Sequence, residues 1–234
     1  MTTLNSRLSR LSLKAVTFAA FRSAPHQACY HEIMIYAVSG VKGGIAKSTS
    51  TLYLAEALAR ENRRVLVIDA DPQGTLLEWE ATAETSGEPL SVRVEGLPSA
   101  VLLRRKLPVL AEQYDVTIID CPNRDTGIIE AAMTAANLVI VPMPPGVEEL
   151  RRARTALHLA EQASTSARLL LTLVDTRTSL AREVTEVIDA DPTLTRFNTT
   201  IRRRAAIAET VGVSRPKELY DYEQLAAETL KEEK

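Results

Sequence analysis

Short apolar runs alternate along the chain with longer segments of helical periodicity. Runs of four to six residues bounded by polar or turn residues are typical of strands that a parallel sheet buries on both faces. The strong runs cover residues 35–38, 65–68, 116–119, 138–141 and 169–174, and weaker ones cover 90–94 and 198–201. The pattern therefore predicts a sheet of mainly parallel strands.

Helices are expected between these strands. Residues 51–61 place Leu52, Leu54, Ala55 and Leu58 on one helical stripe. The other expected helices cover residues 97–113 with a break at Pro108, 148–162, 180–189, 205–211, and a terminal segment from about residue 220. Alternation of strand and helix without an internal repeat predicts an α/β fold with a single doubly wound, mainly parallel β-sheet flanked by helices. Such sheets bind ligands at the carboxyl ends of their strands.

Residues 1–33 differ from the rest in composition. They are rich in Ser and carry four basic residues, with Glu32 as the one acid. Three interpretations stay open: a start codon placed too far upstream, a genuine arm that is disordered or touches DNA, or a targeting peptide. We expect residues 1–33 to be an extension and residues 34–234 to form one domain.

Composition excludes several classes of protein. With 45% hydrophobic and 25% charged residues, the 234-residue chain has the composition of an ordinary globular domain. Cys29 and Cys121 lie far apart and have no CxxC partner, which argues against a disulfide framework or zinc site and favours a reducing cytoplasm. No apolar run approaches the roughly 20 residues that span a membrane. The net charge of −2 means that nucleic-acid binding would need a local basic patch.

A glycine-containing turn follows the first strand, in the stretch 36–51 (YAVSGVKGGIAKSTST). Backbone N–H groups at the start of the next helix have no intrahelical acceptors, so this strand–turn–helix unit predicts an anion site. Gly43 and Gly44 have no Cβ and allow the backbone to wrap closely around phosphates. Lys47 can neutralise the β- and γ-phosphates, and the hydroxyl of Ser48 can bind Mg²⁺.

Three aspartates follow buried strands at the same predicted edge of the sheet: Asp69, Asp71 and Asp120. A carboxylate at a strand end can hold Mg²⁺ through water or orient a water that attacks the γ-phosphate. Any one of them alone would more often be a turn or helix-cap residue.

The standard phosphate-loop pattern G-x-x-x-x-G-K-[ST] is absent, because Val41 and Ala46 occupy its glycine positions. The pattern K-G-G-x-x-K-[ST] fits instead and resembles the deviant Walker A motif of the ParA/MinD superfamily of P-loop ATPases. The resemblance implies that Lys42 reaches across a dimer interface to the phosphates of the other subunit. It also implies nucleotide-binding residues throughout the loop: Lys42, Gly43, Gly44, Ile45, Ala46, Lys47, Ser48 and Thr49. We expect Ala46 to be tolerated in place of glycine only if it keeps a negative φ.

Two further strings resemble motifs of that superfamily. VLVIDADPQG is similar to its D-x-D-P-Q motif, and DVTIIDCPN to its Walker B strand. The resemblance implies that Asp71 orients the attacking water, that Asp69 supports the Mg²⁺ shell, and that Asp120 is an outer-shell partner of Mg²⁺. The implied catalytic residues are Lys42, Lys47, Asp71 and Asp120, and the implied metal site comprises Ser48, Asp69 and Asp120. LTLVDTRTSLAREV resembles the segment near the nucleotide base and adds Asp175 and Arg177 to the nucleotide-binding set.

Basic residues cluster late in the chain. Residues 151–204 contain ten arginines against six acids, and Arg202, Arg203 and Arg204 are adjacent. Arginine offers a planar, bidentate donor to phosphate, so this run is a candidate for DNA contact without sequence preference. The alternative is a solvated face whose arginines pair with nearby acids. The stretch also resembles the C-terminal part of the superfamily that contacts DNA.

The resemblance implies an ATPase that uses ATP and Mg²⁺ and dimerises on ATP. It further implies non-specific DNA binding on the nucleoid in the cytoplasm and segregation of plasmid or chromosomal DNA with a ParB-like partner. One alternative is an ATPase that positions a protein cargo on the nucleoid. A second alternative, from another class, is a metabolic ligase of the dethiobiotin synthetase type. No membrane partner is expected, because the chain ends in QLAAETLKEEK, which lacks the bulky apolar face of a membrane-binding helix.

Overall fold

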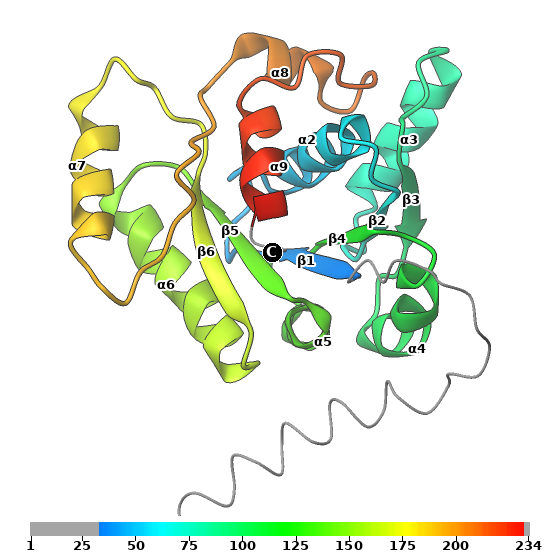
Figure 1. The fold of residues 1–234 in the computed structure, drawn as a ribbon, viewed down its shortest axis with the longest axis horizontal. Coiled ribbons are helices and arrows are strands. Elements are labelled where there is room, and N and C mark those ends of the chain that lie inside the picture. The colour runs from blue at the N-terminus through cyan, green and yellow to red at the C-terminus, as the bar shows by residue number, and fades with distance from the viewer. Residues whose placement is uncertain (1–32, 232–234) are drawn as a thin grey trace, which may run out of the picture. The chain divides into compact units, whose positions relative to one another are not determined.

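The computed structural model describes residues 33–231, so the interpretations of the N-terminal extension concern a segment outside the described residues. Within this range the chain forms a six-stranded sheet of order β3-β2-β4-β1-β5-β6 in which every strand pair is parallel (Figure 1). The strands are β1 Met34–Val38, β2 Val65–Asp69, β3 Arg93–Gly96, β4 Val116–Asp120, β5 Leu138–Met143 and β6 Ser166–Leu171. The predicted fold class is confirmed.

The strand register brings the carboxyl ends of the central strands into line. Asp120 is the partner of Val38 in β1 on one side and of Asp69 in β2 on the other. The turn after β1 and the acidic residues that end β2 and β4 therefore share one edge of the sheet, as the alternation pattern predicts.

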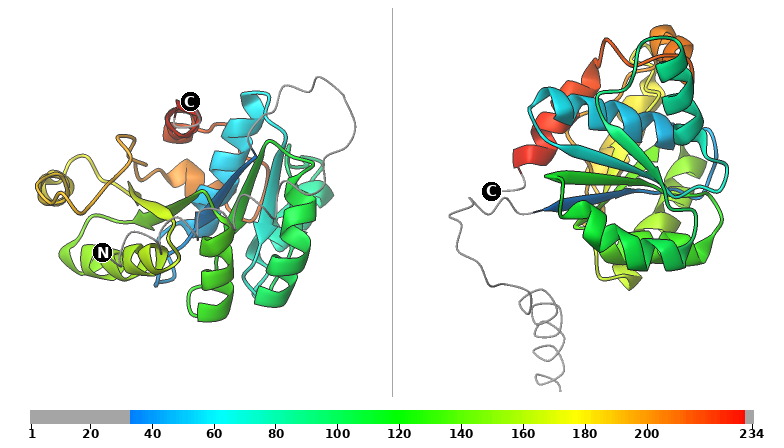
Figure 2. Two further views of the ribbon diagram at one scale, coloured as in Figure 1. Left: turned by 60° about the horizontal axis from the view of Figure 1, so that its bottom comes forward. Right: turned by 90° about the vertical axis from the view of Figure 1, so that its right-hand side faces the viewer.

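Helices cover both faces of the sheet, as the right-hand view of Figure 2 shows. One hydrophobic cluster joins the sheet to α2 Lys47–Arg60, α3 Thr75–Thr85, α8 Ala205–Thr210 and α9 Asp221–Lys231. A second cluster joins the opposite face to α4 Ala100–Ala111, α5 Thr126–Ala135, α6 Val147–Gln162 and α7 Ser179–Asp189. Neighbouring residues of β1 divide between the clusters, with Tyr36 and Val38 in the first and Ala37 in the second.

The C-terminal helix α9 packs on α2, the helix that follows the phosphate loop. The rings of Tyr53 and Tyr222 lie 5.1 Å apart, and the hydroxyl of Tyr222 lies 3.0 Å from that of Ser50. Burial raises the pKa of Tyr222, so its hydroxyl stays protonated and available for this hydrogen bond. Within the described range, no helix is long and apolar enough to cross a membrane.

Several predicted boundaries are wrong. Helix α4 continues through Pro108, which lies on its exposed side, where water can satisfy the carbonyl that the missing N–H leaves free. Residues 198–201 form no strand and are flanked by single bridges at Arg196 and Arg202. Strand β6 begins and ends three residues before the predicted run, and helices α3 and α5 were not predicted.

Candidate functional site

Two residues in the loop between β1 and α2 have a positive φ. Gly44 has φ +74°, and Ala46, at the N-cap of α2, has φ 66° and ψ 32°. The expectation of a negative φ at Ala46 is thus wrong. An L-residue in this left-handed region costs about 1–2 kcal/mol, and alanine has no side-chain polar group to offset it. The loop therefore holds Ala46 in a strained conformation directly before Lys47.

A hydroxyl from another strand fixes this loop from outside. Thr172 follows β6, is fully buried, and donates from Oγ1 to the carbonyl oxygen of Ile45 over 3.1 Å. The Ile45 side chain in turn folds over Gly40, where a Cβ would stand 2.5 Å from Ile45 Cδ1. The sequence analysis missed Thr172. Its one signal was a polar residue inside the apolar run LLLTLV.

The ammonium group of Lys47 is buried beneath the loop. The residue is 8% exposed, and its two hydrogen-bond partners among residues 33–231 are neutral oxygens, Oδ1 of Asn123 and the carbonyl of Lys42 at 3.5 Å. Desolvation lowers the pKa of Lys47, although the nearby carboxylates of Asp120 and Asp71 oppose this shift. A buried cation with neutral partners is a site prepared for an anion.

Beside it, α2 and β4 join through a hydroxyl–carboxylate pair. Ser48 Oγ donates to Asp120 Oδ2 over 2.6 Å, and Thr51 Oγ1 lies 3.4 Å from Asp120 Oδ1. Burial raises the pKa of Asp120 to about 7, against the opposing effects of the Ser48 hydrogen bond and the charge of Lys47. A divalent cation would relieve this desolvation, and Ser48 and Asp120 offer the oxygen ligands that Mg²⁺ prefers.

Both oxygens of Asp69 are engaged by backbone N–H groups. Oδ2 accepts from Leu76 at 2.9 Å and from Leu77 at 3.2 Å in the first turn of α3, and Oδ1 accepts from Asp71 at 3.2 Å. Burial raises the pKa of Asp69 despite these hydrogen bonds. Asp69 thus caps α3 and shapes the turn that carries Asp71. Its support of a metal shell remains a prediction.

Asp71 lies at the surface of the same edge, in the turn between β2 and α3. Its Oδ1 accepts from the backbone N–H of Gln73 at 3.0 Å. The second oxygen, Oδ2, is in no hydrogen bond within the described part of the chain. Its role in orienting a water remains a prediction.

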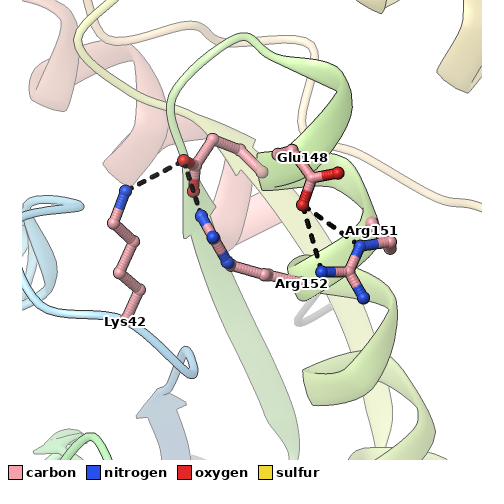
Figure 3. Close-up of polar contacts among 5 residues, drawn as sticks. Lys42, Glu148, Arg151 and Arg152 are labelled. Atoms are coloured by element: carbon pink, nitrogen blue, oxygen red, sulfur yellow. Dashed lines mark hydrogen bonds and ion pairs between the residues drawn. The ribbon is translucent and has the colours of Figure 1, made fainter.

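Lys42 points away from the loop toward the first turn of α6 (Figure 3). Its Nζ lies 3.0 Å from Oε1 of Glu149, the same oxygen that Arg152 contacts over 3.1 Å. A second pair, Glu148 with Arg151, lies beside this contact on the same helix. The sequence analysis did not identify Glu149, which is 107 residues from Lys42.

The segment expected near the nucleotide base forms its own ion pair. Arg177 contacts both carboxylate oxygens of Asp175, at 2.9 and 2.7 Å, and these bonds hold the pKa of Asp175 well below its usual range. In this structure the two residues bind each other. Their contact with a nucleotide remains a prediction.

The three adjacent arginines have different surroundings. Arg202 donates from Nε and Nη2 to Oδ1 of the buried Asp221, and Arg204 lies 4.6 Å from the centre of the Tyr220 ring. Arg203 is exposed, and its backbone N–H binds the carbonyl of Val174. Two of the three side chains therefore have structural contacts. Arg202 and Arg203 are both exposed, and the Arg203 side chain forms no hydrogen bond or ion pair in the described part of the chain.

The residues of the loop fit the polyphosphate of a nucleotide. Helix α2 begins without a side-chain cap and without an acid in its first turn. The free N–H groups of that turn can therefore donate hydrogen bonds to a bound anion. A buried lysine with neutral partners and a Ser48–Asp120 pair suited to Mg²⁺ complete the site. Fold and site together define a P-loop nucleotide-binding protein.

Comparison with known proteins extends this assignment. The family "CobQ/CobB/MinD/ParA nucleotide binding domain" matches residues 36–216, and the chain belongs to it. The chain is 35% identical over 164 residues to the maintenance of carboxysome distribution protein A of Gloeobacter kilaueensis, covering 68% of this chain and 70% of that protein. It is 26% identical over 239 residues to the chromosome partitioning protein ParA of Myxococcus xanthus, covering 83% and 84%. A plasmid partition protein of Borrelia burgdorferi bound to AMPPNP has the same fold, with TM-score 0.70, 18% identity, and coverage of 86% and 100%.

Proposed function

We propose that this chain is a ParA-type ATPase that dimerises on ATP, binds DNA without sequence preference, and distributes a cargo over the nucleoid. The observation that carries the proposal is the buried Lys47 ammonium at the uncapped start of α2, with the second lysine Lys42 five residues earlier. The ligands of the site are ATP and Mg²⁺.

The roles of the residues follow from their positions. Lys47 would supply positive charge to the phosphates, and Ser48 and Asp120 would hold the metal. Bound Mg²⁺ would neutralise charge on the phosphate oxygens. Asp71, in the turn that follows β2, would orient the attacking water, since its Oδ2 accepts no hydrogen bond among residues 33–231. Lys42 is the residue that would complete the site of a second subunit.

The proposed DNA contact rests on Arg203, the exposed member of its run whose side chain forms no hydrogen bond or ion pair among residues 33–231. One exposed arginine per subunit binds a duplex weakly, and a two-fold pair doubles the contact, so dimerisation on ATP would switch DNA binding on. A ParB-like partner would stimulate hydrolysis and release the dimer from the nucleoid.

The cargo has two candidates. DNA is supported by the similarity to a chromosome partitioning protein, and a protein assembly is supported by the 35% identity to a carboxysome distribution protein. The proposed ATP cycle could serve either cargo, and a small basic protein encoded in the neighbouring open reading frame would favour DNA partition. A metabolic ligase would instead need no DNA.

The test is a titration of DNA binding and ATP turnover in the same preparation. The purified chain is measured by fluorescence anisotropy with duplexes of two unrelated sequences, without nucleotide, with ADP and with ATP, each with Mg²⁺. We expect both duplexes to bind with similar affinity, and only in the presence of ATP. DNA should increase ATP turnover, and Lys47→Ala should lose both DNA binding and turnover. Turnover that ignores DNA, without ATP-dependent DNA binding, would contradict the proposal and favour the ligase.

A further inference from the structure

Asn123 reaches the phosphate loop from a different part of the sheet. It lies in the turn between β4 and α5, three residues after Asp120. Its side-chain oxygen accepts a hydrogen bond from Lys47 Nζ. Its amide nitrogen lies 3.6 Å from where a Cβ would stand on Gly43, so the side chain extends over the loop between Lys47 and Gly43.

The orientation of this amide follows from chemistry. A lysine ammonium has three donors and no acceptor, so the amide atom that faces Lys47 is the oxygen. The NH₂ group then faces the loop over Gly43. A Cβ on Gly43 would be in van der Waals contact with this group, so the absence of a side chain there leaves room beside it.

We propose that Asn123 makes the site distinguish a nucleoside triphosphate from a diphosphate. Without nucleotide, its oxygen is the partner that the buried Lys47 needs. When the phosphates bind and Lys47 turns to them, the amide donates a hydrogen bond from Nδ2 to the terminal phosphate. An amide can accept from a cation and donate to an anion, which a carboxylate cannot do.

The position of the contact between Asn123 and Lys47 favours the terminal phosphate over the inner ones as the acceptor of this hydrogen bond. The backbone amides at the start of α2 face the inner phosphates, and the lysine of such a loop extends to the β- and γ-phosphates. Asn123 contacts the tip of that lysine from the strand β4 side, next to the Ser48–Asp120 pair. It therefore flanks the outer end of the ligand. This inference rests on ATP binding and not on DNA or cargo.

The experiment compares two dissociation constants of the full chain by isothermal titration with Mg²⁺, for ADP and for a non-hydrolysable ATP analogue. Protein is kept at a concentration at which light scattering shows a monomer with either nucleotide, so dimerisation does not enter the ratio. A hydrogen bond to a charged group contributes about 1.5–3 kcal/mol, so Asn123→Ala should lower the preference for the triphosphate by about tenfold or more. Loss of the competing Lys47 contact affects both nucleotides alike and leaves the ratio unchanged.

Two further variants sharpen the test. Asn123→Asp keeps an acceptor for Lys47 but places a negative charge beside the phosphates, and should lower the ratio further. Thr126→Ala is the matched control, since Thr126 is exposed at the start of α5 in the same turn, and it should keep the wild-type ratio. Unchanged discrimination in a folded Asn123→Ala, or equal loss in Thr126→Ala, would overturn the proposal. If thermal melting shows that Asn123→Ala does not fold, the ratio in Asn123→Asp decides in the same way. A wild-type chain that binds neither nucleotide would refute ATP binding itself.

Discussion

Lys42 Nζ lies 3.0 Å from Glu149 Oε1, so the first lysine of the loop motif is paired within its own subunit. The Lys42 side chain is 50% exposed and that of Glu149 is 18% exposed. Ion pairs at such exposure contribute about 0.2–1 kcal/mol. The pair is therefore weak enough for Lys42 to leave it if, as proposed, Lys42 contacts the phosphates of a second subunit.

Replacement of Lys42 separates nucleotide binding from dimerisation. Lys42→Ala should bind ATP as a monomer, because Lys47 and the helix start remain intact. It should not dimerise, and its turnover should fall by about 100-fold, the effect of losing one group that stabilises charge in the transition state. Light scattering with ATP and a turnover assay check this. An ATP-dependent dimer with normal turnover would show that Lys42 does not act across an interface.

Removal of the Glu149 charge should favour the dimer. In Glu149→Gln, Lys42 can move to the second subunit without breaking an ion pair. ATP-dependent dimerisation should therefore occur at protein concentrations up to about tenfold lower. Glu148→Gln is the matched control, since Glu148 is the adjacent residue and pairs with Arg151 instead (Figure 3). Sedimentation over a protein dilution series measures both variants. A weaker dimer in Glu149→Gln would mean that Glu149 positions Lys42 in the dimer.

Asp71→Ala should bind ATP and Mg²⁺ but hydrolyse at least about 100-fold more slowly, because positioning of water by a carboxylate contributes to the chemical step alone. The dimer should then persist. Asp71→Asn is informative beside it, since the amide keeps the acceptor for the Gln73 N–H and preserves the turn while the charge is lost. Single-turnover hydrolysis is the measurement. Normal rates in both variants would show that another residue orients the attacking water, and Asp69 would be the next candidate.

The strain at Ala46 predicts a substitution that stabilises the protein. Ala46→Gly should raise the free energy of unfolding by about 0.5–1 kcal/mol, because relief of the left-handed alanine exceeds the entropy that glycine loses on folding. Asn62 also has a positive φ, of 61°, but asparagine tolerates it, so Asn62→Gly should gain less. Urea unfolding of the nucleotide-free chain compares them. A destabilised Ala46→Gly would show that the positive φ at this position carries little strain.

The sequence predicted the parts of the site that neighbouring residues determine. The apolar strand runs, the glycine turn and the start of α2 are local signals, and the parallel sheet then brings Asp69 and Asp120 to one edge. Asp125, which caps α5 through the Ile128 N–H, was a local signal for that missed helix. By contrast, α3 is capped by Asp69 on a preceding strand, which no local pattern reveals.

The remaining contacts join segments far apart in the sequence. Glu149 holds Lys42 and Thr172 holds the Ile45 carbonyl, each across more than one hundred residues. Such pairs depend on the docking of whole elements, and periodicity carries no information about them. The left-handed φ of Ala46 is similar, since the surrounding loop imposes a conformation that alanine alone disfavours.

The adjacent arginines should separate into one that binds DNA and one that stabilises the fold. Arg202→Ala removes the main partner of Asp221 and should lower the free energy of unfolding. Burial raises the pKa of Asp221, but the hydrogen bonds from Arg202 outweigh it and the net pKa is lowered. This stabilisation is therefore present above the unfolded pKa of about 3.9 and is lost as the pH falls through the folded pKa. The free energies of unfolding of the wild type and of Arg202→Ala should therefore converge in acid.

Arg203→Ala should leave stability unchanged and weaken DNA binding in the ATP state. Two arginines are lost per dimer, so the slope of log affinity against log salt should fall by about 1.8, at about 0.9 for each phosphate contact. Arg203→Lys is the control that keeps the charge, and it should retain most of the slope. Anisotropy titrations across salt, with ATP binding measured in parallel, give the answer. If Arg203→Ala binds DNA with the wild-type slope, the contact lies elsewhere, with Arg215, Lys217 and the N-terminal extension the next sites to test.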